Sequence, residues 1–206
     1  MMWRGLFLAG GVLILIGGPM HPGGTMAEML AHPDWLMAHV LVTAGFAAML
    51  GGLILFGRQA GLTARLRKVT RYAAIATALQ TFEGVMHTAS MVDAGHLVAG
   101  HSTPVLTTHL FLAVTLYPIF AAGMIAFILA GMRDGAVGSR WIAWPGILGA
   151  AAHGLSAPLA VGLGMEGARI LFPMIVGLAL WFVLAAVIPT SALRASVGKP
   201  AGAAQA

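Results

Sequence analysis

The sequence predicts an all-α fold: a polytopic integral membrane helical bundle of about six transmembrane helices, with both termini cytoplasmic. Three observations support this prediction: the composition, the length of the apolar segments and the one-sided placement of lysine and arginine. Hydrophobic residues make up 59% of the 206 residues, and charged residues make up 8%. Soluble domains carry about 25% charged residues, so a soluble fold of this length would lack a polar surface.

Six apolar segments approach or exceed the roughly 20 residues that a helix needs to cross the hydrocarbon core of a bilayer. They are Trp3–Pro19, Trp35–Phe56, Val69–Met91, Pro104–Met132, Trp141–Leu163 and Ala168–Pro189. Only helices satisfy their own backbone polar groups in lipid without closing a barrel, and the alternating pattern of barrel strands is absent. We therefore expect a six-helix transmembrane domain over residues 1–190 and a disordered cytoplasmic tail over residues 191–206.

The first segment also has the charged and apolar regions of a signal peptide, because Arg4 precedes the apolar stretch from Leu6 to Ile16. No convincing small-residue cleavage site follows it, so we expect an uncleaved first helix. Prolines inside the last three segments are expected to kink these helices without ending them. They are Pro118, Pro145, Pro158 and Pro173.

Lysine and arginine gather in the connections that follow the second and fourth segments. These connections hold Arg58, Arg65, Arg67, Lys68, Arg71, Arg133 and Arg140. The positive-inside rule places them in the cytoplasm, together with both termini. The outer side then receives Pro19–Asp34, Val92–Thr103 and Gly164–Gly167, where Arg169 lies nearby as the one stray basic residue. The composition, rich in alanine, glycine and leucine, points to the inner (plasma) membrane of a bacterium.

The high isoelectric point, near 10.8, does not indicate nucleic-acid binding. The basic residues flank apolar segments and form no patch on a polar domain, so they act as topology signals and as contacts for anionic lipid headgroups. We expect the lipid bilayer as a partner, with a redox partner or other membrane subunits as further candidates, and no nucleic acid.

Several chemistries are excluded by missing residues or motifs. The chain has no cysteine, which removes disulfides, iron–sulfur clusters and thiolate metal sites. It has no phosphate-binding loop, no dinucleotide-binding glycine motif and no His-Glu-x-x-His zinc motif. Nothing in the sequence assigns an enzymatic activity.

All eight histidines lie on the outer side or in the outer part of a helix. At 1.5 Å per residue, His39, His87 and His109 lie about one turn below the outer ends of three different helices, and His153 lies deeper in a fourth. Glu83 is one turn below His87 on the same face. We expect these five residues to converge on one cavity with Glu83 at its floor. The remaining histidines are expected in outer loops beyond that cavity: His21, His32, His96 and His101.

The third segment supports an inward-facing site, because its polar residues follow a helical period. They are Thr77, Gln80, Glu83, His87 and Ser90. Such a stripe cannot face lipid and should face the bundle interior. A carboxylate at this depth is costly unless it is protonated or partnered. Of the residues in this stripe, Glu83 therefore points most strongly to a function.

Haem b is the first candidate ligand, with electron transfer as the function. A six-coordinate haem takes two axial imidazoles from different helices, here two of His39, His87, His109 and His153. Small residues around His153, such as Gly146, Gly149 and Ala150, would admit a porphyrin or, equally, would let helices pack closely. The layout resembles in outline the bis-histidine membrane cytochromes; the likeness rests on histidines on central helices and covers no contiguous motif.

A bare transition metal is the second candidate, held by His39, His87 and His109 with Glu83 or His153, since imidazole and carboxylate suit zinc, copper or iron. Copper handling or transport is favoured by methionines in the first outer loop, whose thioethers select copper; they are Met20, Met26, Met29 and Met37. Asp93 could join such a site. The remaining alternative is a non-catalytic structural subunit, in which the polar residues only hold the helices together.

Overall fold

The computed structural model of the protein describes residues 2–188, and within them every regular element is helical. The all-α prediction is therefore confirmed. The expected disordered tail, residues 191–206, lies outside the described residues, as do the last two residues of the expected transmembrane domain.

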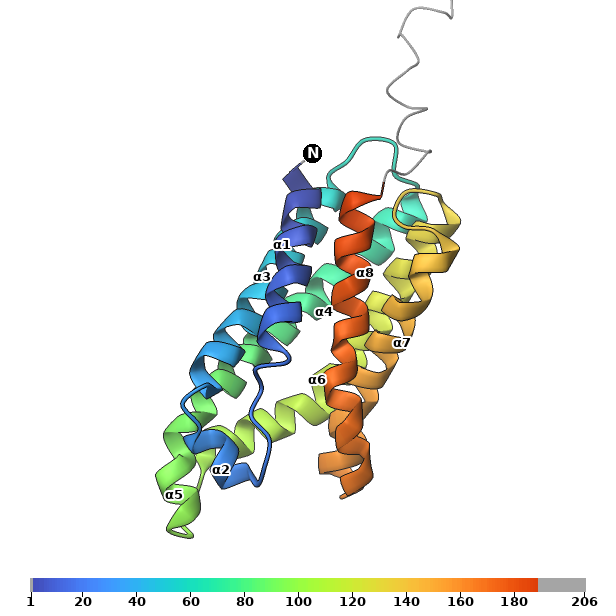
Figure 1. The fold of residues 1–206 in the computed structure, drawn as a ribbon. Helices are drawn as coiled ribbons and strands as arrows, with labels where there is room; N and C mark the ends of the chain where they lie inside the picture. The colour runs from blue at the N-terminus through green and yellow to red at the C-terminus, as the bar shows by residue number, and fades with distance from the viewer. Residues whose placement is uncertain (1, 189–206) are drawn as a thin grey trace, which may run out of the picture.

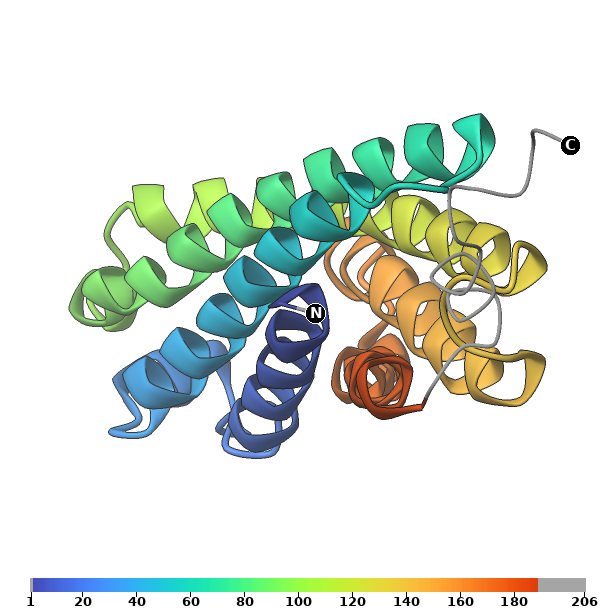
Figure 2. The same ribbon diagram turned by 90° about the horizontal axis from the view of Figure 1, so that it is seen from above.

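Six long helices form the bundle, and each packs against the next one along the chain (Figure 1). They are α1 (Met2–Gly17), α3 (Trp35–Gly57), α4 (Ala64–Ala89), α6 (Pro104–Arg133), α7 (Arg140–Ala157) and α8 (Ile175–Val187). The last helix packs against the first, which closes the ring of neighbours, as the view along the helices shows (Figure 2). Each of the six predicted segments overlaps one of these helices.

Prolines shorten the last two helices more than the sequence suggested. The fifth segment was expected to be one helix to Leu163, but α7 ends at Ala157 and passes into a π-helical turn, η2 (Pro158–Gly162). The sixth segment begins as a 3-10 helix, η3 (Glu166–Met174), before α8. Pro158 and Pro173 lie at these changes, since proline removes a backbone donor and clashes with the preceding turn.

Short helices order the end of the bundle that carries the histidines. They are α2 (Met26–Ala31), η1 (Ser90–Asp93) and α5 (Ala94–Val98). The capping box of α2 is complete: the Glu28 backbone N–H donates to Thr25 Oγ1, and the Thr25 backbone N–H donates to Glu28 Oε2 at 2.8 Å. Asp93, considered above as a ligand, instead accepts a 2.8 Å hydrogen bond from the Leu106 backbone N–H in the first turn of α6, so its carboxylate caps that helix.

Three helical runs are long and apolar enough to cross a membrane: Trp35–Gly57, Pro104–Arg133 and Glu166–Val187. These runs suggest a membrane protein. The first turns of α4 are basic and its interior stripe is polar, which lowers its mean hydropathy. Its opposite face nevertheless exposes large apolar side chains at helical spacing: Tyr72, Ile75, Leu79, Phe82 and Val85. A helix that is polar inside and apolar outside fits lipid; this supports the count of six spans, which stays a prediction.

The apolar core lies toward the end of the bundle that holds the N-terminus. Aromatic rings from several helices meet there edge to face: Phe7 of α1 lies 4.7 Å from Phe182 of α8 and 6.3 Å from Phe127 of α6, measured between ring centroids. Edge-to-face contacts are favourable for aromatic pairs. The polar interior residues of α4 lie farther along the bundle, so the two halves of the interior differ in chemistry.

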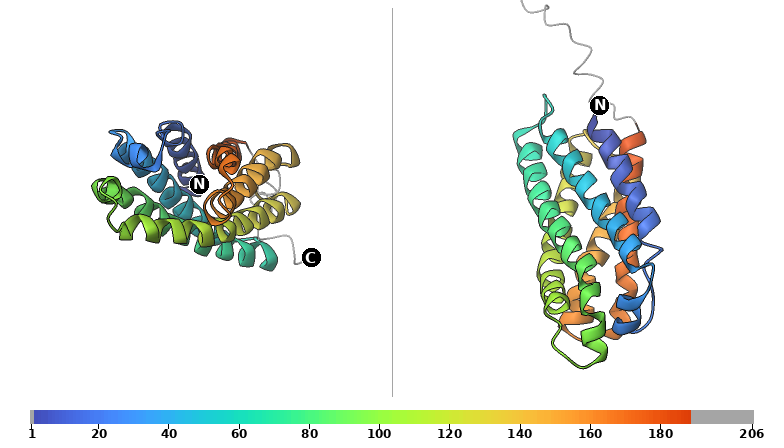
Figure 3. Two further views of the ribbon diagram at one scale, coloured as in Figure 1. Left: turned by 90° about the horizontal axis from the view of Figure 1, so that it is seen from below. Right: turned by 90° about the vertical axis from the view of Figure 1, so that its left-hand side faces the viewer.

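The basic connections lie at the same end as the start of α1 and the end of α8, opposite α2 and α5 (Figures 1 and 3). Asp134 joins the two connections there: its carboxylate accepts from Thr63 Oγ1 at 2.6 Å and pairs with Arg65. The hydrogen bond from Thr63 is the main cause that holds the pKa of Asp134 below its usual value. The neighbouring Arg65 lowers this pKa further. Arg169, at the other end, is paired with Glu166 at 2.9 Å.

Glycines in α7 and α8 permit a close helix crossing. A Cβ added at Gly149 would lie 2.4 Å from the Leu178 backbone nitrogen, and one at Gly177 would lie 2.6 Å from the Pro145 carbonyl oxygen. Gly149 is therefore required for the packing of α7 against α8. It is one of the small residues that the sequence also allowed to face a porphyrin.

We expect the connection between α3 and α4 to face the cytoplasm, because the positive-inside rule acts on its arginines. A periplasm-active reporter fused at Gly61 should be silent, and the same reporter at Gly100 should be active. The reverse pattern would overturn the orientation.

We expect Gly149→Ala to lower the free energy of unfolding by about 1–3 kcal/mol, the usual cost of overpacking an interior. Thermal unfolding in detergent, followed by near-UV circular dichroism, measures the change. Gly5→Ala is the matched control, since a Cβ there meets nothing within 4 Å. Equal stability of the two variants would contradict the close crossing.

Candidate metal centre

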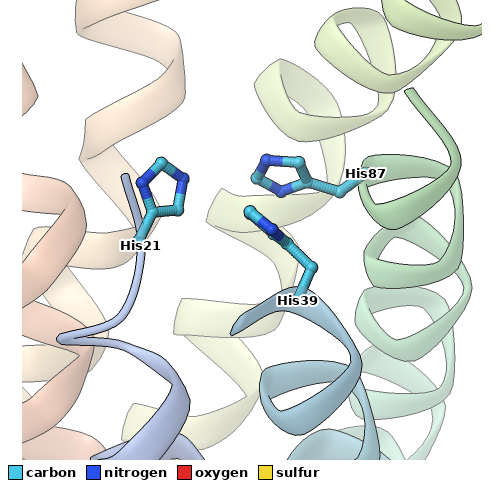
Figure 4. A group of neighbouring side chains, drawn as sticks. All are labelled: His21, His39 and His87. Carbon is cyan, nitrogen blue, oxygen red and sulfur yellow. The ribbon is translucent and has the colours of Figure 1, made fainter. Parts of the chain in front are cut away.

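Four imidazoles form a continuous row at the end of the bundle opposite the basic connections. Their rings come from different elements: His21 from the segment after α1, His39 from α3, His87 from α4 and His109 from α6. Ring centroids of successive pairs lie 4.8 Å (His21 to His39), 4.3 Å (His39 to His87) and 3.9 Å (His87 to His109) apart. Figure 4 shows the first three rings directed toward one another.

Two of these imidazoles have a defined tautomer. His39 Nδ1 lies 2.6 Å from the Trp35 carbonyl oxygen, and His21 Nδ1 lies 2.9 Å from the Pro22 carbonyl oxygen. A carbonyl oxygen only accepts, so each Nδ1 carries the proton and each Nε2 keeps its lone pair. His39 Nε2 is buried and has no hydrogen-bond partner among the described residues. A buried lone pair without a partner is costly unless something else binds it.

Trp35 fixes the position of His39. Its ring lies 4.0 Å from the His39 ring and tilts by 31°, and its Nε1–H donates to the Thr88 carbonyl oxygen on α4 at 3.2 Å. Trp35 is fully enclosed by Leu30 of α2, Leu106 of α6 and their neighbours. The packing of three elements around one indole therefore sets the distance between His39 and His87.

Glu83 and His109 form a buried pair across α4 and α6. His109 Nδ1 lies 2.7 Å from Glu83 Oε1, and the other carboxylate oxygen accepts from Gln80 Nε2 at 2.9 Å. Tyr117 interacts electrostatically with the carboxylate. Both side chains of the Glu83–His109 pair are buried. A carboxylate that orients an imidazole is the usual second-shell partner of a metal-binding histidine.

His153 lies outside the row and packs against Tyr117. The two rings are stacked with centroids 4.1 Å apart. Both ring nitrogens of His153 are buried and have no hydrogen-bond partner among the described residues. His153 also packs against Phe46 and Phe120, so its surroundings are more apolar than those of the other imidazoles.

Two overlapping groups of side chains could hold a metal ion. One comprises His21, His39 and His87, and the other comprises Glu83, His87 and His109; within each group, one potential ligand atom per residue lies within 4.8 Å of the others. The structure thus brings together four of the five predicted residues. The fifth, His153, belongs to neither group.

His21 was expected in a loop beyond the cavity, and the structure corrects this. In a turn after α1 the His21 backbone N–H donates to the Gly18 carbonyl oxygen at 3.1 Å, and the His21 ring lies beside that of His39. His21 comes shortly after Gly17, the last residue of α1, so it must lie at the level of the outer helix ends. This short spacing was the signal in the sequence that could have placed His21 beside the other histidines. The other outer-loop histidines lie apart from the row: His32 is near Asp34, and His96 is near His101.

Two methionines of the first outer loop serve packing. Met26 and Met29 lie against the buried cluster of Leu30, Trp35 and Leu106. The ordinary role of methionine as an apolar filler accounts for this pair.

Comparison of the chain with protein-family models, curated proteins and solved structures finds no match. The site is therefore interpreted from its own geometry. The arrangement offers imidazole nitrogens and one carboxylate in a buried region, which are ligands that zinc, copper and iron accept.

We expect Glu83→Ala to destabilise the bundle strongly, because it leaves His109 and Gln80 without their shared hydrogen-bond partner. Each buried polar group left unpaired costs about 1–3 kcal/mol, so the free energy of unfolding should fall by more than it does for a typical surface substitution. Titration with a denaturing detergent measures the free energy of unfolding. Glu28→Ala, at the exposed cap of α2, is the control, and an equal loss in both variants would show that Glu83 is not a structural acceptor.

Proposed function

We propose that the protein is an integral membrane protein that binds a transition-metal ion, copper or zinc, at the row of histidines on the outer side of the membrane. The observation that carries this proposal is the pair of defined tautomers. His21 and His39 each direct Nδ1 at a backbone carbonyl, and both lie with His87 in a group that could hold a metal ion. Metal-binding histidines are typically oriented in this way by a bond from their other ring nitrogen.

The neutral form of His21 supports metal binding at neutral pH. Partial desolvation beside the other rings lowers the pKa of His21 from its ordinary value. Metal ligands must be deprotonated, and a lower pKa keeps the imidazole neutral and able to bind.

A bare ion fits the ring spacing better than haem b. The two axial ligands of a haem stand on opposite faces of the macrocycle, so the porphyrin plane has to pass between them. The His87 and His109 rings are stacked, with centroids 3.9 Å apart and planes 20° apart, which leaves no room for that plane between these two residues. Haem b held by this pair, with an electron-transfer role, therefore ranks below the bare metal.

The six-span count, the cytoplasmic termini and the bacterial inner membrane belong to the same proposal. With this orientation, the row of histidines is reached from the outside, where a soluble donor or a free ion would deliver the metal.

His87 is shared by both groups of ligands, so its loss should have the largest effect. We expect His87→Ala to weaken zinc or copper binding by about tenfold or more, because even partners of ligands cost about that much when they are removed. The double variant His39→Ala/His109→Ala should match it. Metal content after purification in detergent, together with competition against a chelator, measures the loss.

His32→Ala and His96→Ala are matched controls, since both remove an outer-loop imidazole that lies away from the row. They should keep wild-type affinity. Equal metal content in all variants would reject the site. A Soret band that depends on His87 would show that the bound group is haem and not a bare ion.

A further inference from the structure

The two groups of ligands share a single residue, which suggests movement of the ion. We infer that the row holds two alternative ion positions, an outer one at His21, His39 and His87 and an inner one at Glu83, His87 and His109, and that an ion loaded at the outer position passes to the inner one by ligand exchange at His87. This inference rests on the proposed function and deepens it.

The outer position is the one that meets solvent. His21 is exposed, whereas His39 is 5% exposed. His21 also comes from a connecting segment and not from one of the long helices, so it has the freedom to bind and release an ion. The three outer ligands are imidazoles, and an ion bound there keeps its full charge.

The inner position offers what the outer one lacks, a carboxylate. Glu83 is 1% exposed and His109 is 5% exposed. A doubly charged ion is costly in a low-dielectric interior unless an opposite charge lies beside it. Glu83 is the carboxylate that supplies this charge, so the deeper position is the one at which an ion is retained.

His87 lies between the positions and connects them. Its ring centroid lies 4.3 Å from that of His39 and 3.9 Å from that of His109. Ligands on both sides are therefore within reach while the ion stays bound to His87, and the ion need not return to water. The Glu83–His109 hydrogen bond of 2.7 Å already holds two inner ligands together.

Cobalt(II) provides a spectroscopic test, because its visible absorption depends on its ligands. The full chain in detergent micelles is mixed with one equivalent of Co²⁺ in a stopped-flow spectrometer. We expect two phases, a fast phase as the ion binds at the outer position and a slower spectral shift as it reaches Glu83. A single phase with one spectrum would overturn the two-position inference.

Variants on separate elements assign the phases. His21→Ala should lose the fast phase and still reach the wild-type final spectrum. Glu83→Gln should keep the fast phase and lose the second shift, and His109→Gln, on α6, should reproduce this result. His32→Ala should behave as wild type. A wild-type time course in Glu83→Gln and His109→Gln would refute the transfer.

The failure of the proposed function gives a different result. If the chain binds no metal, no variant and no wild-type sample develops a cobalt spectrum at all. If the chain binds metal at one position only, the wild type develops a spectrum in one phase, and His21→Ala either loses it completely or leaves it unchanged.

Discussion

A carboxylate inside an apolar bundle is the constraint on which the rest of this structure depends. Glu83 is almost completely buried, accepts from Gln80 and is hydrogen-bonded to His109, and it interacts electrostatically with Tyr117. Each partner must approach from a fixed direction, so α4 and α6 cannot rotate freely against each other. Through Tyr117 and His109 the constraint reaches His153 and His87. The polar half of the interior is thus one connected set, which is costly to break at any member.

The opposite half of the interior has no such requirement. Phe7, Phe127 and Phe182 meet edge to face there, and glycines let the helices approach closely. The division explains how a short chain can bury a polar set inside an otherwise apolar bundle. Aromatic packing and small residues hold one end of the ring of helices, and this leaves the other end free to carry groups that are expensive to bury.

Much of the fold and part of the site could be predicted from the sequence. Helix positions follow from the length of the apolar segments, and the depth of a residue follows from the constant helical rise. For this reason the sequence puts His39, His87 and His109 at a similar depth, and their rings are neighbours in the structure. Rotation about the helix axis is only partly encoded. His153 has the right depth, but its ring stacks on Tyr117, and which neighbour it meets depends on the crossing of α6 and α7. His21 was misplaced because a turn at Gly18 determines where the chain returns, and no periodic pattern describes a turn.

The closure of the ring by α1 and α8 has a consequence for biosynthesis. Arg4 Nη1 donates to the Ala186 carbonyl oxygen at 3.0 Å, so α1 is tied to α8, which is synthesised much later. The face of α1 that receives α8 stays uncovered until α8 has been made. The row of imidazoles, in contrast, is carried by residues 21–109, all of which precede α7. The candidate centre can therefore assemble among its own helices before the ring of helices closes.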